Sequence, residues 1–213
     1  MKEKMQDLKA GRTAQKARTR AALVQSASTL MQQGKRPTVE EAAEAVGISK
    51  RTAYRYFVSQ DHMLADAALE SVRPVFAKIL DAPRGAAAPA DRLETLIKSL
   101  NRMAPDYDTE LRVIVRAALD RSPGAARPPG RPRGQRRLDW IAEVLAPLKS
   151  ELPAALYDRL AAALAAMIGF DMYIWLREVG ELSPERVDDV MVWMGRTLLE
   201  ATLEEARERG RRR

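Results

Sequence analysis

The chain has 213 residues, of which 46% are hydrophobic and 31% are charged, so it can bury a core as one large domain or two small ones. It contains no cysteine and a single histidine, His62, which excludes disulfides, cysteine nucleophiles and a histidine-rich metal site within one chain. Residues 1–12 lack the apolar core of a signal peptide, and the uncharged run 160–170 is too short to span a bilayer. We therefore expect a cytoplasmic protein with no membrane partner, no metal and no cofactor.

Positive charge is concentrated at the beginning of the chain. Residues 1–60 contain twelve Lys and Arg against five acidic residues, whereas residues 61–213 contain 24 of each sign, so the net charge of +7 lies entirely in the first segment. Such a segment either attracts a polyanion or forms a solvated basic tail. The elements predicted within it distinguish these two interpretations.

Two helices are predicted first. Apolar residues at helical spacing indicate a helix over 13–33, which Gly34 is expected to end. Thr38 and Glu41 form a capping-box pattern that indicates a short second helix, ending near Gly47.

Two more helices follow directly. Ser49 is placed to cap a third short helix over 50–57. Ser59 opens a longer helix that extends to about residue 80, and Pro74 is expected to kink it or end it early.

Two short helices joined by a glycine-containing turn form a helix-turn-helix unit, whose second helix enters the major groove of DNA. On that helix Ala53 and Phe57 share one face, and we expect them to pack inward with Val46 and Ile48. The other faces carry basic, hydroxyl and phenol groups suited to phosphates and base edges, on Lys50, Arg51, Thr52, Tyr54 and Arg55. No acidic residue occurs over 45–60, which favours DNA binding over a solvated charged face.

A spaced set of residues runs through about a quarter of the chain, roughly 18–65. Its members are Arg20, Leu23, Ala27, Gly34, Thr38, Val39, Ala42, Ala43, Val46, Gly47, Ile48, Ser49, Thr52, Tyr54, Tyr56, Phe57, Ser59, Met63 and Leu64. This set resembles the amino-terminal domain of TetR-type transcriptional regulators. The resemblance implies an all-helical homodimer in which three helices bind DNA and a larger, divergent domain binds a ligand and dimerises.

The resemblance also implies which side chains contact DNA. Phosphate contacts are expected from Thr38, Tyr54 and Tyr56. The residues expected nearest the bases are Lys50, Arg51 and Thr52. The full expected set is Thr38, Ser49, Lys50, Arg51, Thr52, Tyr54, Arg55 and Tyr56. Two positions depart from the family pattern, because Gln60 replaces a phosphate-binding lysine and Ala53 replaces a larger apolar residue.

We predict a DNA-binding domain over 1–58 and an effector-binding and dimerisation domain over 59–213. The basic arm 1–12 either reaches a neighbouring groove or is a disordered terminus. Residues 82–90 are predicted to be a linker. The Pro- and Gly-rich residues 122–135 are predicted to be an exposed flexible loop, since their arginines stand in the wrong order for a minor-groove hook.

The remaining chain is also predicted to be helical, over 91–104, 109–120, 135–149, 153–179 and 184–209. In the first of the last two helices the apolar stripe consists of Leu156, Leu160, Leu164, Met167 and Trp175. In the second it consists of Val187, Val190, Met191, Met194, Leu198 and Ala201. Two long apolar helices exceed what a small monomer needs to cover, so we expect them to pair with a second copy in a two-fold, four-helix interface. The resemblance implies the same homodimer.

An effector pocket is expected in the second domain. Its candidate wall residues are Met103, Tyr107, Trp140, Met167, Phe170, Asp171 and Trp175. Asp171 lies among apolar residues, where a carboxylate is costly to bury unless it is paired. It either selects a cationic or hydrogen-bonding effector, or it forms a salt bridge within the dimer or lies partly exposed.

The sequence contains no Gly-rich phosphate loop, no nucleophile elbow and no pair of acidic residues with a nearby histidine, so we expect no enzyme activity and no catalytic residue. We expect a dimeric regulator, namely a repressor that binds a near-palindromic double-stranded operator and is released by a small-molecule effector. The alternatives are an architectural or effector-independent DNA binder, and a helical enzyme or scaffold in which the basic unit is incidental.

Overall fold

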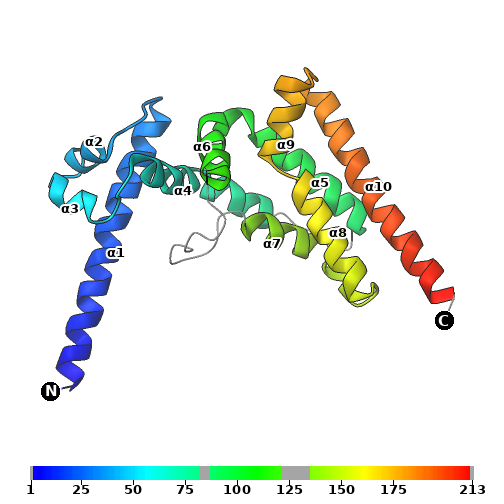
Figure 1. Cartoon of the computed structure of the whole chain (residues 1–213), viewed down its shortest axis with the longest axis horizontal. Helices are drawn as coiled ribbons and strands as arrows, with labels where there is room; N and C mark the ends of the chain where they lie inside the picture. The colour runs from blue at the N-terminus through cyan, green and yellow to red at the C-terminus, as the bar shows by residue number, and fades with distance from the viewer. Residues whose placement is uncertain (1, 82–86, 121–134, 212–213) are drawn as a thin grey trace. The chain divides into compact units, whose positions relative to one another are not determined.

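A computed structural model of the chain describes residues 2–81, 87–120 and 135–211, and every regular element within these ranges is a helix (Figure 1). The α-helices are α1 (Lys2–Gln32), α2 (Val39–Glu44), α3 (Lys50–Tyr54), α4 (Gln60–Asp81), α5 (Pro89–Met103), α6 (Asp108–Leu119), α7 (Gln135–Val144), α8 (Ala154–Met167), α9 (Phe170–Ile174) and α10 (Pro184–Arg211). The shorter segments are the 3-10 helices η1 (Pro105–Tyr107) and η2 (Ala146–Lys149) and the π-helical η3 (Trp175–Val179). The predicted all-α class is confirmed for the described residues.

The chain packs as two compact units. The first consists of Met1–Pro74 with Thr109–Asp120, and the second consists of Val75–Asp108 with Arg121–Arg213. The division therefore falls inside α4, and nearly all of α6 belongs to the first unit. The predicted functional boundary at residue 58 stays a prediction.

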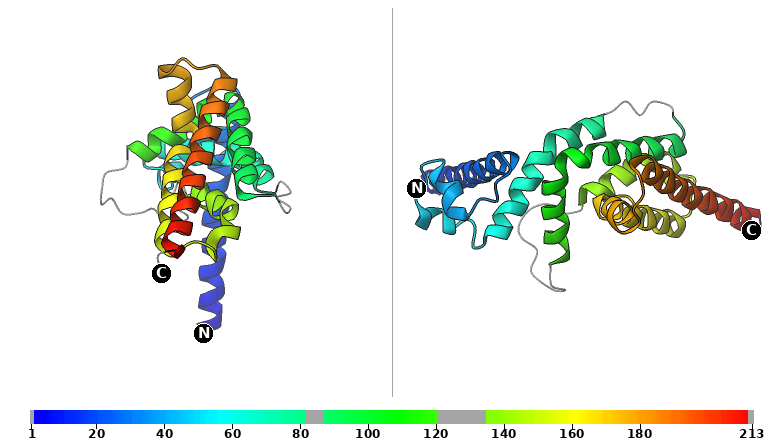
Figure 2. Two further views of the ribbon diagram at one scale, coloured as in Figure 1. Left: turned by 90° about the vertical axis from the view of Figure 1, so that its right-hand side faces the viewer. Right: turned by 90° about the horizontal axis from the view of Figure 1, so that it is seen from above.

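The first unit is built on α1, which begins at Lys2 rather than at residue 13. Its amino-terminal turns extend beyond α2 and α3 (Figures 1 and 2). Its carboxy-terminal half carries the buried stripe of this unit, which includes Leu23, Ala27 and Met31. The predicted stop at Gly34 is confirmed: its φ is +79°, and the following N–H reaches back to the Leu30 carbonyl at 3.0 Å.

A buried chain of hydrogen bonds ties α6 to α1 and α4. The Gln32 amide donates to the Ser71 hydroxyl at 3.1 Å, and that hydroxyl donates to the Glu110 carboxylate at 3.3 Å. Val113 and Ile114 of α6 pack against the core formed by α1 to α4. A helix from the middle of the sequence thus completes the amino-terminal unit.

Pro74 does not end α4, so that part of the prediction is wrong. A proline inside a helix removes one backbone hydrogen bond and costs about 3 kcal/mol. Here the ring is exposed, while Val72 before it and Phe76 after it are buried. Packing of the turns on both sides therefore offsets the local cost.

The second unit is built on α5, α8 and α10, and Figure 1 shows α10 running along the other two. A Cβ on Gly195 would lie 3.0 Å from a Leu93 methyl and 3.3 Å from an Ile97 methyl, so the missing side chain lets α5 and α10 approach closely. The Asn101 amide donates to Asp188 at 2.8 Å across the same pair of helices. These contacts fix the register of α10 on α5.

The helix predicted over 153–179 is broken. α8 ends at Met167, Gly169 has an extended backbone (φ 169°, ψ 171°), and α9 and η3 continue at a bend of 46°. Arg137 of α7 lies over the break, donating to the Ala165 carbonyl at 3.0 Å and to both Asp171 oxygens at 2.7 and 3.3 Å. The Arg137 guanidinium fills the place of a Gly169 side chain, with its nearest nitrogen 2.2 Å from the ideal Cβ position.

Two sequence expectations lie largely outside the described residues. They are the loop 122–135, of which only residue 135 is described, and the linker 82–90, whose last two residues already belong to α5. Within the described part of the chain, no single helix is both long and apolar enough to cross a bilayer, and only the bent pair of α8 with α9 and η3 reaches that length and composition together.

Candidate nucleic-acid interface

The helix α2 begins at a complete capping box. The Thr38 hydroxyl accepts the Glu41 N–H at 3.1 Å, and the Glu41 carboxylate accepts the Thr38 N–H at 2.7 Å and its hydroxyl at 2.9 Å. These bonds hold the pKa of Glu41 below its ordinary value, since they favour the ionised carboxylate. The predicted cap is confirmed, and the Thr38 hydroxyl is already engaged within the protein.

The turn after α2 directs the chain into α3. Gly47 has a φ of +66°, and the Ile48 N–H closes the turn on the Ala43 carbonyl at 2.9 Å. This closure brings Ile48 against the core and leaves Val46 39% exposed. The expectation that Val46 packs inward is therefore wrong, because the turn places the apolar contact one position after the glycine.

The helix α3 is shorter than predicted, ending at Tyr54, although backbone hydrogen bonds of helical type continue to Phe57. Ser49 caps it, accepting the Thr52 N–H at 3.3 Å, and the two hydroxyls lie 2.9 Å apart. Ala53 and Phe57 are fully buried, as expected. Two anchored positions thus fix which side of α3 faces outward.

The outward side of α3 is cationic. Lys50, Arg51, Tyr54 and Arg55 are exposed, and Thr52 and Tyr56 are half-buried. Arg51 and Arg55 form no ion pair with any described residue, so their guanidinium groups are available to a ligand. Seven of the eight predicted residues thus lie on or directly beside one short helix, and Thr38 lies apart from them at the start of α2.

Lys50 differs from the two arginines because it forms an ion pair with Glu40 of α2. This hydrogen bond and the charge of Glu40 raise the pKa of Lys50. Glu40 was not predicted to belong to this surface, although an acidic residue on the preceding helix is a possible partner for Lys50. Any phosphate that binds Lys50 must compete with this carboxylate.

Phe57 is held from outside the helix as well. The Arg20 guanidinium lies 5.2 Å from the centre of its ring, and Arg20 also forms an ion pair with Asp66 of α4. His62 meets the Phe57 ring edge-on at 5.6 Å, with its Nε2 3.8 Å from Asp66. These side chains brace the end of α3 against α1 and α4.

Gln60 has a structural role that its sequence position did not predict. Its amide donates to the carbonyls of Arg36 and Pro37, at 3.3 and 3.1 Å. The first residue of α4 therefore clamps the turn that leads into α2. Gln60 is neutral, so it adds no charge to the surface where a lysine would.

The seven pocket residues predicted for the second domain are all in the second unit, but not all lie inside it. Met103, Trp140, Met167 and Phe170 are buried, and Tyr107 is half-buried. Asp171 is exposed and paired with Arg137, and Trp175 is 56% exposed. Their role in ligand binding stays a prediction.

Trp140 is the one member of this set with an unmet polar group. Its ring packs edge-on against Phe76 at 4.8 Å, and its buried Nε1–H has no acceptor among the described residues. A buried donor without a partner costs about 1–3 kcal/mol.

The predicted apolar stripe of α10 divides between two faces. Val187 and Met191 are buried within the unit together with Gly195 and Leu199. The other predicted members are half-buried (Val190, Met194 and Leu198) or exposed (Ala201), and Trp193 on the same helix is 65% exposed. A partly uncovered apolar face therefore runs along α10, as an interface with another molecule requires.

No cluster of three or more acidic or histidine side chains that could hold a metal is found in the described ranges. No protein-family model matches the chain. No curated protein is significantly similar to it in sequence.

Proposed function

We propose that the protein is a dimeric, DNA-binding transcriptional regulator of the TetR type, in which α2 and α3 form a helix-turn-helix unit. The observation that carries the proposal is the outward side of α3, where Arg51 and Arg55 have no acidic partner among the described residues and the stretch 45–60 contains no acidic residue. The buried Ala53 and Phe57 hold this side in one orientation. Such a rigid basic helix suits the major groove.

Phosphate and base contacts divide along the helix in this proposal. Arg51 and Thr52, near the start of α3, read base edges, and Tyr54, Arg55 and Tyr56 bind the backbone. Two copies place their α3 helices in successive major grooves, about 34 Å apart. A near-palindromic operator follows from the two-fold symmetry.

The second unit supplies dimerisation and effector binding in the proposal. The uncovered apolar face of α10 supports the first role. The unpartnered Trp140 N–H supports the second, because an effector with a hydrogen-bond acceptor would satisfy it. An effector that prefers one spacing of the two α3 helices would lower operator affinity, which makes the protein a repressor released by its ligand.

The test is binding of the purified protein to DNA from upstream of its own coding sequence, at low and high salt, with random-sequence DNA as competitor. Selective binding that weakens with salt, at one dimer or more per site, supports the proposal. Equal competition by random DNA favours an architectural binder. Absence of binding at low salt overturns the proposal and favours a helical enzyme or scaffold.

The first prediction concerns Arg51. Replacing it with alanine removes a bidentate base contact, so Arg51→Ala should cost about 1–3 kcal/mol at the selected site and reduce selectivity. Parallel titrations of specific and random duplexes measure both quantities. Arg73→Ala, an exposed arginine on α4, is the control. Full selectivity in the Arg51 variant would contradict its role.

A further inference from the structure

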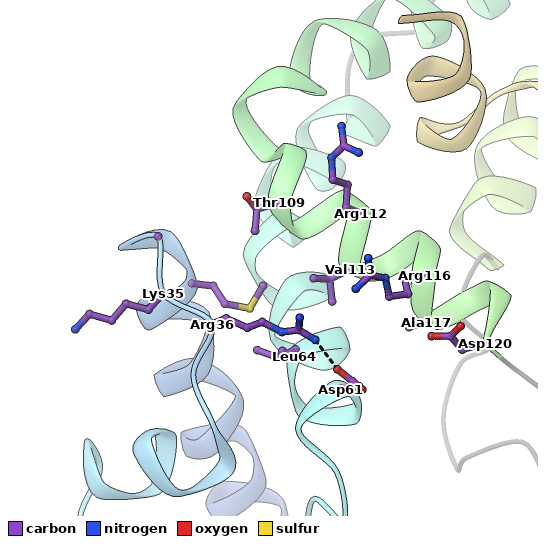
Figure 3. Close-up of a pocket in the computed structure, with 12 residues that line it drawn as sticks. Lys35, Arg36, Asp61, Leu64, Thr109, Arg112, Val113, Arg116, Ala117 and Asp120 are labelled. Atoms are coloured by element: carbon purple, nitrogen blue, oxygen red, sulfur yellow. Dashed lines mark hydrogen bonds and ion pairs between the residues drawn. The ribbon is translucent and has the colours of Figure 1, made fainter. Parts of the chain in front are cut away.

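A cavity of about 270 Å³ lies within the first unit, where the end of α1 and the turn after it meet α4 and α6 (Figure 3). One face of α6 forms its wall, at the helical spacing Thr109, Arg112, Val113, Arg116, Ala117 and Asp120. None of the residues predicted for the effector pocket lines it. This cavity is therefore separate from the site expected in the second unit.

The cavity has an apolar floor. Met31 and Leu64 are buried at its base, and Val113 and Ala117 of α6 are half-buried beside them. Its volume is just below the range of about 300–1,000 Å³ usual for ligand pockets, so it suits a small molecule with a compact apolar body.

The rim has an excess of positive charge. Four cationic residues line the cavity against two acidic ones, Asp61 and Asp120. Asp61 is already paired with Arg36 at 2.9 Å. Arg116 forms no ion pair with any described residue, and Figure 3 shows it and Arg36 extending into the same space while Lys35 points away.

We propose that this cavity binds a small amphipathic carboxylate, with its apolar body on the floor and its carboxylate between Arg116 and Arg36. A planar guanidinium binds a carboxylate through paired hydrogen bonds, which is the strongest neutralisation available to an arginine. The apolar floor selects such a ligand over a purely polar anion. The charge balance of the rim selects it over a neutral molecule of the same shape.

The cavity lies next to the turn that leads into α2. Arg36 belongs to the turn that leads into α2, and Gln60, next to Asp61, holds the carbonyls of Arg36 and Pro37. A carboxylate that draws Arg36 away from Asp61 changes the attachment of this turn. If α2 and α3 bind DNA as proposed above, the ligand therefore changes DNA affinity from within the DNA-binding unit itself.

Benzoate is the probe, and the readout is the methyl NMR signal of Met31 in the full chain labelled with [methyl-13C]methionine, assigned with Met31→Leu. Benzoate should shift the Met31 signal saturably and leave that of Met191, buried in the second unit, unchanged. Arg116→Gln should weaken binding by about fivefold or more, and Asp120→Asn should strengthen it, since each changes one rim charge. Lys78→Gln, an exposed cation of the second unit, is the matched control and should change nothing.

Two further probes test the two halves of the ligand. Benzyl alcohol keeps the ring without the charge, and inorganic phosphate keeps the charge without the ring, so both should bind more weakly than benzoate by about fivefold or more. The proposal is overturned if benzoate leaves Met31 unshifted, if benzyl alcohol or phosphate binds equally well, or if Arg116→Gln has no effect.

The effect of the ligand on DNA binding is measured separately, as the affinity of the protein for the selected DNA with and without benzoate. A change in DNA affinity that Arg116→Gln abolishes supports it, and an unchanged affinity at saturating benzoate overturns it. The Met31 signal requires no DNA. Failure of the protein to bind DNA would therefore overturn the proposed function and leave the carboxylate site to be decided by NMR.

Discussion

Single residues determine how much of the positive charge on α3 is available. Lys50 is paired with Glu40, whereas Arg51 and Arg55 are free of such pairing with described residues. An exposed ion pair of this kind contributes little to stability. Its main consequence is that one of the three cations is already neutralised within the protein.

The second prediction follows from this pair. Glu40→Gln should release Lys50 for a phosphate, so DNA affinity at low salt should rise and the slope of log K against log salt should steepen by about 0.9. Titrations at several salt concentrations measure the slope. Glu204→Gln on α10 makes the same change in net charge far along the sequence and should leave the slope unaltered. A slope unchanged in the Glu40 variant would show that Lys50 does not meet DNA.

The helix predicted over 153–179 is interrupted at Gly169. The third prediction is that Gly169→Ala destabilises the protein by about 1–2 kcal/mol, because the new Cβ displaces the Arg137 guanidinium and breaks its pair with Asp171. Denaturant unfolding measures this loss. In an Arg137→Gln background the same substitution should cost much less, since the clash with the guanidinium is gone and the Asp171 carboxylate, 2.5 Å from the same Cβ position, is no longer held in place by Arg137. Equal costs in both backgrounds would contradict the mechanism.

Helix starts and stops that depend on residues close in sequence were predicted correctly. Features that depend on residues distant in sequence were not. The capping box of Thr38 with Glu41, the cap at Ser49 and the stop at Gly34 involve residues a few positions apart, and all three are confirmed. The break at Gly169 depends on Arg137, which is remote in sequence. The passage of α4 through Pro74 likewise depends on the tertiary burial of Val72 and Phe76.

The packing of α5 against α10 depends on charge as well as on apolar contact. Arg196 of α10 bonds Glu94 at 2.7 and 3.2 Å and Asp91 at 3.2 Å, and Lys98 also bonds Glu94 at 2.7 Å. Lys98 and Arg196 together hold the pKa of Glu94 below its ordinary value of 4.5. A lowered pKa means that the ionised carboxylate stabilises the folded state above about 4.5, and that this stability is lost as the pH falls through the lowered value.

The fourth prediction is that Glu94→Gln lowers the free energy of unfolding at pH 7 by about 0.5–1 kcal/mol. The difference from the parent protein should shrink as the pH falls below 4.5, because the parent then also loses the charge. Urea unfolding at a series of pH values measures both curves. Glu204→Gln, on the exposed side of α10, should give no such convergence. A difference independent of pH would indicate a steric rather than an electrostatic cause.

For the whole molecule, the candidate DNA surface was predictable, but the state of its side chains was not. Helical spacing predicted Lys50, Arg51, Thr52, Tyr54 and Arg55, whereas Thr38 and Tyr56 followed only from the resemblance to TetR-type regulators. The engagement of Thr38 with Glu41, of Lys50 with Glu40 and of Gln60 with the turn before α2 required coordinates. The cavity beside α6 was not predictable at all, because it joins segments from three separate parts of the sequence.

The fifth prediction concerns assembly. The partly uncovered apolar face of α10 should pair with that of a second copy, so the chain of 23.8 kDa should have twice that mass in solution. Trp193→Glu places a charge on this face and should shift the protein to monomer and weaken operator binding. Light scattering after size-exclusion chromatography measures the mass. Leu119→Glu, at an even more exposed apolar position in the first unit, should remain dimeric.

The place of α6 has a consequence for modularity. Residues 109–120 lie well after the segment that would bind DNA, but Glu110, Val113 and Ile114 complete its polar chain and its core. A chimaera that joins only residues 1–58 to a foreign regulatory domain would therefore lack the packing and hydrogen bonds that α6 supplies to the core of the first unit. We therefore expect such a chimaera to fold only when residues 109–120 accompany α1 to α4, because the first unit of this chain is discontinuous in sequence.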